Sequence, residues 1–123
     1  MIQKQLSDAE LEIMSIIWHV QHPILFAQIT EELAKSGRCW QKNTLITLLS
    51  RLMQKGYLKA TKQGRKNQYS PCITEQEFQS DQTKHFVDKI YQGNISSLVA
   101  QLVQNDSLSE SEYAELKKIL EEK

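Results

Sequence analysis

The sequence predicts a mainly α-helical fold with one small β-hairpin, and two observations carry this prediction. Leucines recur at helical spacing in TLITLLSRLM, and after Gly56 the pattern changes to two short alternating strands around Gly64. Residues 38–73 hold eight Lys or Arg and no Asp or Glu. A helix with a polar face followed by a basic hairpin is typical of a winged helix-turn-helix, which we expect over residues 1–73.

Composition and charge limit the classes of protein that are possible. Of 123 residues, 40% are hydrophobic and 24% charged, as in soluble globular domains. The net charge of zero divides into +5 for residues 1–73 (ten basic, five acidic) and −5 for residues 74–123 (five basic, ten acidic). This asymmetry indicates a polyanionic partner for the first half only.

Several other classes are disfavoured. No apolar run is long enough to span a bilayer, and the start MIQKQLSD lacks the apolar core of a signal peptide, so we expect a cytoplasmic protein without membrane insertion. Cys39 and Cys72 are far apart, and His19 and His22 lack a neighbouring carboxylate or thiolate, so no metal site and no cofactor are expected. No catalytic motif is present, which argues against an enzyme.

The first three helices follow from capping and spacing. Ser7 with Glu10 forms a capping box for a helix that ends near Val20. A second helix is expected over residues 27–35, and a third from about Trp40 to the residue before Gly56. The second and third helices form the helix-turn-helix.

The third helix has two faces. Its apolar stripe consists of Leu45, Leu48, Leu49, Leu52 and Met53. The other face carries the expected recognition residues Asn43, Thr44, Ile46, Thr47, Ser50 and Arg51. The strands of the hairpin are expected over residues 57–61 and 68–72, with Lys62, Arg65 and Lys66 as the cations of the wing. The helix is expected to enter the major groove of double-stranded DNA while the wing contacts phosphates.

The second half predicts three further helices. Capping boxes at Thr74 with Glu77 and at Ser109 with Glu112 begin two of them, and residues 95–103 form the one between. Fifty residues are near the lower limit for a self-sufficient core, so residues 74–123 are expected to pair with a second copy rather than to fold back on the winged domain. The expected dimer-interface residues are Phe86, Ile90, Leu98, Leu102, Leu116, Ile119 and Leu120. A homodimer matches a pseudo-palindromic operator.

Several segments together resemble the penicillinase-repressor family. They are LSDAELEIMSIIW, TLITLLSRLMQKGYL, GRKNQYSP and VDKIYQGNISSLVAQLV, spread over nearly the whole chain. The resemblance implies a homodimeric bacterial repressor that binds TACA/TGTA half-sites and a C-terminal dimerisation domain of three interlocked helices. It places DNA contacts at Asn43, Thr44, Ile46 and Thr47, with Arg51 beneath and Lys62, Arg65 and Lys66 in the wing. Relatives commonly carry a basic residue where this chain has Ile46, which either meets a thymine methyl or is a tolerated surface isoleucine.

The resemblance also bears on the inducing signal. In the β-lactam-resistance branch a membrane sensor-protease system triggers cleavage of the repressor, and the matching bond here joins Gln101 to Leu102. The copper-responsive branch ends in a cysteine-rich motif that these 123 residues lack, so the β-lactam branch is favoured. Two alternatives stay open. One is a repressor of the same fold that answers a metal or small ligand without cleavage, and the other is a winged-helix module for protein–protein assembly.

Overall fold

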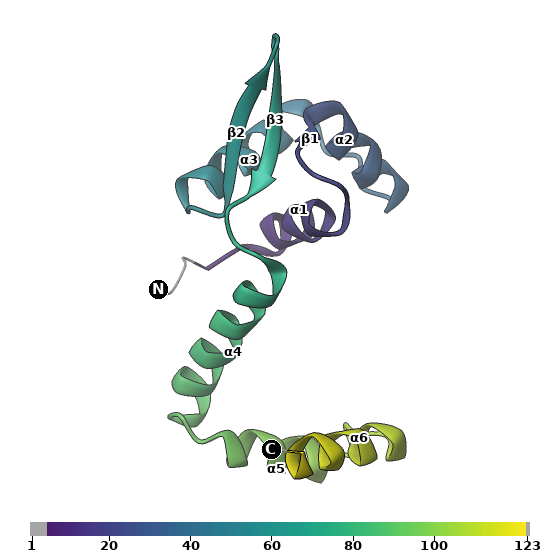
Figure 1. Cartoon of the computed structure of the whole chain (residues 1–123), viewed down its shortest axis with the longest axis vertical. Helices are drawn as coiled ribbons and strands as arrows, with labels where there is room; N and C mark the ends of the chain where they lie inside the picture. The colour runs from purple at the N-terminus through teal and green to yellow at the C-terminus, as the bar shows by residue number, and fades with distance from the viewer. Residues whose placement is uncertain (1–4, 123) are drawn as a thin grey trace. The chain divides into compact units, whose positions relative to one another are not determined.

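The structure, a computed structural model, describes residues 5–122 and is mainly helical with one small antiparallel sheet (Figure 1). Its elements are α1 (Asp8–His19), β1 (Ile24–Leu25), α2 (Phe26–Lys35), α3 (Lys42–Gln54), β2 (Leu58–Gln63), β3 (Lys66–Pro71), α4 (Glu75–Tyr91), α5 (Ile95–Gln104) and α6 (Glu110–Glu121). The fold class predicted from the sequence is therefore confirmed. The chain forms two compact units, Met1–Asp81 and Gln82–Lys123.

Local side chains determine where several helices begin. At α1, the Ser7 N–H donates to Glu10 Oε1 over 2.7 Å, and the Glu10 N–H donates to Ser7 Oγ over 3.1 Å. The same reciprocal bonds join Thr74 to Glu77 at α4 and Ser109 to Glu112 at α6. Each pair satisfies two backbone donors that the first turn of a helix leaves free. The three predicted capping boxes are present.

The hairpin is longer than the sequence indicated. Strands β2 and β3 pair antiparallel from Leu58 opposite Pro71 to Gln63 opposite Lys66, which leaves Gly64 and Arg65 as a two-residue loop. Gly64 has φ +62°, and glycine at the first position of such a loop is typical of a type II′ turn. The pairing therefore continues to the loop, beyond the predicted strands at 57–61 and 68–72.

A third strand was not predicted. Ile24 pairs with Tyr69 and Leu25 with Gln68, so β1 is the outer neighbour of β3 in a sheet of order β1-β3-β2. This short pairing ties the segment between α1 and α2 to the hairpin. Ile24 is buried as a result.

The core of the first unit lies between its helices and the base of the hairpin. Its buried residues are Ile13, Met14, Ile17, Ile24, Ile29, Leu33, Leu45, Leu48, Leu49, Leu52, Tyr57, Leu58, Tyr69, Ile73 and Phe78. The tip of the hairpin extends beyond the helices (Figure 1), and residues 61–66 are exposed. The base of the wing thus belongs to the core, whereas its tip is free to meet a partner.

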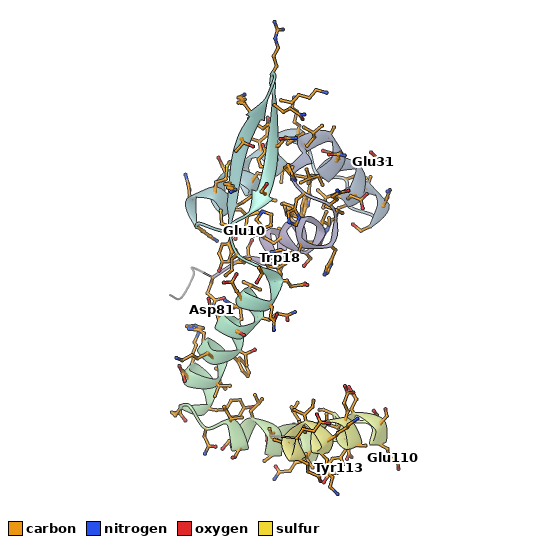
Figure 2. The ribbon with its side chains drawn as sticks, in the orientation of Figure 1. Glu10, Trp18, Glu31, Asp81, Glu110 and Tyr113 are labelled. Carbon is orange, nitrogen blue, oxygen red and sulfur yellow. The ribbon has the colours of Figure 1, made fainter. Side chains whose placement is uncertain are left out.

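The beginning of α4 also belongs to this core. The Trp18 indole N–H, on α1, donates to the carbonyl oxygen of Ile73 over 2.9 Å (Trp18 is labelled in Figure 2). The Phe78 ring lies 5.2 Å from the Trp18 ring and 5.8 Å from the Tyr57 ring, measured between centroids. From sequence, Phe78 was grouped with the C-terminal helices; the structure places it in the first unit's core.

The second unit holds the rest of α4 with α5 and α6. Among residues 82–122, Val87 is the one buried hydrophobic side chain, 4% exposed. Eight large hydrophobic side chains of these residues are exposed: Phe86, Ile90, Ile95, Leu102, Val103, Tyr113, Ile119 and Leu120. This unit therefore lacks a core of the kind seen in the first. Across the part of the chain that the structure describes, no helix has the length and apolar character needed to span a membrane.

Candidate nucleic-acid interface

Helix α3 is held by one face and open on the other. Leu45, Leu48, Leu49 and Leu52 are buried in the core of the first unit. The six expected recognition residues are all exposed: Asn43, Thr44, Ile46, Thr47, Ser50 and Arg51. Four apolar side chains at helical spacing fix the rotation of α3 about its own axis, so the polar face points to solvent as a set.

Internal hydrogen bonding limits what one of these residues can do. The Thr47 hydroxyl donates to the Asn43 carbonyl oxygen over 2.9 Å within α3. Its proton is therefore engaged, and the outward chemistry of Thr47 is that of an acceptor oxygen and a methyl group. At the start of α3, Gln41 provides no side-chain cap, so the amide donors of the first turn are not satisfied by that route.

The wing carries its cations on both faces. Lys62 is opposite Asn67 and Gln63 is opposite Lys66, and side chains alternate between faces along a strand. Lys62 therefore projects from one face of the hairpin and Lys66 from the other, with Arg65 in the loop. All three cations are exposed. The sequence identified the cations but not their division between two faces.

Two of the eight basic residues counted in the run from 38 to 73 are neutralised by α1. Arg38 donates to both carboxylate oxygens of Glu12, over 2.7 and 3.2 Å, and Lys55 Nζ lies 2.6 Å from Glu10 Oε1. The other six make no salt bridge within residues 5–122; they are Lys42, Arg51, Lys59, Lys62, Arg65 and Lys66. The run without acids therefore offers fewer unpaired cations to a polyanion than the sequence suggested. Among the described residues, every basic residue assigned to the interface is without a salt bridge.

The Glu10 carboxylate is the one buried charged group in the core of the described chain, only 1% exposed (labelled in Figure 2). Burial raises its pKa, but hydrogen bonds from Lys55 and Ser7 outweigh that effect, so the pKa of Glu10 lies below its ordinary value. Among the residues that the structure describes, none is a hydrogen-bond partner of Glu10 Oε2. This ion pair joins α1 to the end of α3 and so helps to hold α3 in place.

Comparison with known proteins assigns the chain to a family. The family model described as "Penicillinase repressor" matches residues 6–122. The chain belongs to the penicillinase repressor family. It is 39% identical to the penicillinase repressor of Bacillus licheniformis over 96% of this chain and 91% of that protein. It is 34% identical to the methicillin resistance regulatory protein MecI of Staphylococcus aureus over 97% of this chain and 95% of that protein.

A solved structure extends the likeness to the fold of the first unit. The DNA-binding domain of the repressor BlaI matches with a TM-score of 0.52 and 40% sequence identity, over 62% of this chain and 93% of that domain. The candidate interface of this member of the penicillinase repressor family is thus on the unit whose fold resembles the DNA-binding domain of BlaI.

The C-terminal site residues are in a different environment. Of the seven expected dimer-interface residues, Phe86, Ile90, Leu102, Ile119 and Leu120 are exposed, whereas Leu98 and Leu116 are half-buried. The expected cleavage site, Gln101 and Leu102, lies within α5, and both of its residues are exposed.

The histidines and cysteines do not assemble into a site. His19 Nε2 lies 3.0 Å from Glu75 Oε1, and His22 Nδ1 lies 3.2 Å from the Val20 carbonyl oxygen. Cys39 and Cys72 are free thiols. Among residues 5–122, no group of three or more His, Cys, Asp or Glu side chains is placed to hold a metal ion.

Proposed function

We propose that this chain is a transcriptional repressor of β-lactam-resistance genes that binds a pseudo-palindromic operator in double-stranded DNA as a homodimer. One observation carries the proposal: among the described residues, the exposed face of α3 and the unpaired cations of the wing belong to one unit, in a chain that is 40% identical to a solved DNA-binding domain over 62% of its length. In this proposal residues 1–73 form the DNA-binding domain and residues 74–123 form the dimerisation domain.

The proposed binding mode assigns different tasks to the two elements. An α-helix fits the major groove, where base edges present a distinct pattern for each base pair, so the short side chains of α3 read sequence. The wing cations contact phosphates, which position the protein but carry no sequence information. Because Lys62 and Lys66 project from opposite faces of the hairpin, the wing is suited to phosphates on either side of its tip.

Dimerisation accounts for the exposed apolar side chains of the second unit. Forty-two residues with a single buried hydrophobic side chain among those described do not bury enough apolar surface to be stable alone. A second copy presents the same apolar surface, so a two-fold interface is self-complementary. Joining two winged units also turns two weak half-site contacts into one strong operator contact.

Relief by proteolysis is the proposed release step, with a sensor-protease system as the partner and the bond between Gln101 and Leu102 as the target. A protease needs an extended segment. Within one copy of the chain α5 has no buried residue, so opening it locally breaks few contacts other than those that we assign to the dimer. Cutting there separates α6 from α4, and thereby removes part of the apolar surface that we assign to the dimer.

Fluorescence anisotropy tests DNA binding directly. The full chain is titrated onto a duplex selected by the chain from random DNA, and onto a scrambled duplex of equal length, between 50 and 300 mM salt. The slope of log affinity against log salt is expected to be about −0.9 for each phosphate contacted. A flat response to salt, or equal affinity for both duplexes, contradicts the proposal.

Release is tested separately in bacteria that carry a β-lactam sensor and this chain. After exposure to a β-lactam, mass spectrometry of the recovered chain is expected to show a fragment that ends at Gln101. Loss of operator binding with the chain intact contradicts the proteolytic step and favours a repressor that answers another signal.

A further inference from the structure

Ile46 is an exposed apolar side chain on the polar face of α3. It is 46% exposed, and the first unit has one other exposed large hydrophobic side chain among its described residues, Leu11 at 37%. Leu11 is on α1, away from the recognition residues in sequence. Ile46 is on α3, among the residues that we assign to base reading.

The neighbours of Ile46 place it on the interface. Asn43, Ile46 and Ser50 follow the spacing i, i+3 and i+7, so they form one stripe along α3, and all three are exposed. The four buried leucines of α3 occupy the opposite side of the helix, so the core does not account for Ile46. Three residues of helix rise about 4.5 Å, and base pairs are about 3.4 Å apart, so side chains one turn apart on α3 are spaced to reach neighbouring base pairs.

The chemistry of the major groove offers one apolar group to such a side chain. Guanine, cytosine and adenine present hydrogen-bond donors and acceptors there, whereas thymine adds a C5-methyl group. Isoleucine neither donates nor accepts a hydrogen bond. Its β-branched side chain is stiff at χ1, so little side-chain entropy is lost on contact.

We propose that Ile46 is a specificity-determining residue that contacts the C5-methyl group of a thymine in each operator half-site. This inference rests on the DNA-binding function proposed above and assigns a particular base to a particular side chain. The contact buries two apolar groups from water. It also favours thymine over cytosine at that position, because cytosine has no C5-methyl group to bury.

Replacing thymine with deoxyuridine tests the contact, because this change removes the methyl group and keeps the base pairing. Each thymine of the selected operator is replaced in turn, and affinity is measured by anisotropy for the wild-type chain and for Ile46→Ala. One position in each half-site is expected to lose about fourfold in wild-type affinity, the factor for one buried methyl group. Ile46→Ala is expected to bind the thymine and deoxyuridine operators equally well at that position.

Leu11→Ala is the matched control, since it truncates the other exposed hydrophobic side chain of the same unit. It is expected to keep the wild-type ratio between the thymine and deoxyuridine operators. Ile46→Val, which keeps the β-branch, is expected to give an intermediate ratio, and circular dichroism checks that each variant is folded.

The outcomes separate this inference from the proposed function. If the wild-type chain selects an operator but no deoxyuridine position weakens binding, the contact with a methyl group is wrong while DNA binding stands. The same holds if Ile46→Ala retains the full sensitivity to deoxyuridine. If the wild-type chain binds no duplex at low salt, the proposed function itself fails.

Discussion

Glu10 shows how a single residue can serve both local and long-range structure. Its side chain closes the capping box of α1, and the same Oε1 atom accepts from Lys55 at the end of α3. A buried carboxylate is tolerated only when it is paired, because removing it from water is costly. Helix α3 is therefore fixed by an ion pair at its C-terminal end as well as by its leucines.

Breaking this pair is expected to destabilise the first unit. Lys55→Met keeps the length of the side chain and leaves the Glu10 charge buried without its partner, at a cost of about 3 kcal/mol in the free energy of unfolding. This is the low end of the usual range, because Lys55 is 24% exposed. Urea denaturation at pH 7 measures the loss.

The pH dependence of that loss follows from the lowered pKa of Glu10. A carboxylate whose folded pKa lies below its unfolded value of 4.5 contributes stability above pH 4.5 and loses it as the pH falls through the folded pKa. Because Lys55→Met removes a group that lowers this pKa and keeps the burial that raises it, the difference between the wild-type chain and Lys55→Met is expected to shrink as the pH falls and to be smallest below the folded pKa of Glu10 in the wild-type chain. Arg38→Met, which breaks the exposed pair with Glu12, serves as the control and should cause a much smaller loss at every pH. A pH-independent difference for Lys55→Met contradicts the assignment.

Of the two partners of Glu10, only Ser7 could be predicted from the sequence. The bond between Ser7 and Glu10 spans three residues and has a recognisable spacing, so it was predicted. Lys55 is 45 residues from Glu10, and no local pattern connects them. Lys55 and Arg38 were accordingly counted among the eight basic residues of the run without acids, although carboxylates of α1 pair with both of them.

Substitutions of Asn43 and Lys66 distinguish a base-reading side chain from one that contacts phosphate. An asparagine paired with adenine is worth about 1–3 kcal/mol of discrimination, so Asn43→Ala is expected to lower operator affinity by about tenfold and leave random DNA nearly unaffected. Lys66→Gln is expected to weaken both complexes alike. Competition between labelled operator and unlabelled random duplex measures the ratio. Equal losses on both duplexes from Asn43→Ala would remove it from the set of base readers.

At the scale of elements, the hairpin was predictable in kind but not in detail. Gly64 and the alternating strands indicated it, and the four leucines of α3 gave that helix its correct orientation. Strand β1 was missed because two residues, Ile24 and Leu25, are too few to show an alternating pattern. Its existence depends on pairing with β3, more than 40 residues later, which no local rule contains.

The two faces of the wing lead to a prediction about salt dependence. Lys62→Gln and Lys66→Gln remove one cation from opposite faces of the hairpin, without loss of a salt bridge. If both faces contact phosphates, each substitution lowers the magnitude of the salt slope by about 0.9 for every contact removed. Lys84→Gln, an exposed lysine of α4, is the matched control and should leave the slope unchanged. A change from only one of the two wing variants would show that the wing lies on DNA by a single face.

In the molecule as a whole, the N-terminal part has both the excess of basic residues and the hydrophobic core, whereas the C-terminal part is acidic and has little core. The first unit has a core, unpaired cations and an exposed polar helix face, whereas the acidic second half has one buried hydrophobic side chain among residues 82–122. In the sequence, the sum of charges distinguishes residues 1–73 (+5) from residues 74–123 (−5). The place of Phe78 could not be predicted in this way, because its apolar position on α4 fits either half until Trp18 and Tyr57 are seen beside it.

The weak core of the second unit makes the assembly state the most informative property of the molecule. Leu102 is exposed on α5, and Leu102→Asp places a charge within the apolar surface that we assign to the dimer. A buried, unpaired carboxylate disfavours association strongly, so the variant is expected to sediment as a monomer at concentrations where we expect the wild-type chain to sediment as a dimer.

Ser96→Asp adds the same charge to the same helix at an exposed polar position, and it should leave the wild-type sedimentation unchanged. Because a monomer contacts one half-site, Leu102→Asp should also lose operator affinity while its affinity for an isolated half-site is retained. Retained half-site binding distinguishes a broken interface from an unfolded chain. If Leu102→Asp still forms dimers at the concentrations used for the wild-type chain, the dimer interface does not include Leu102 and lies on another surface.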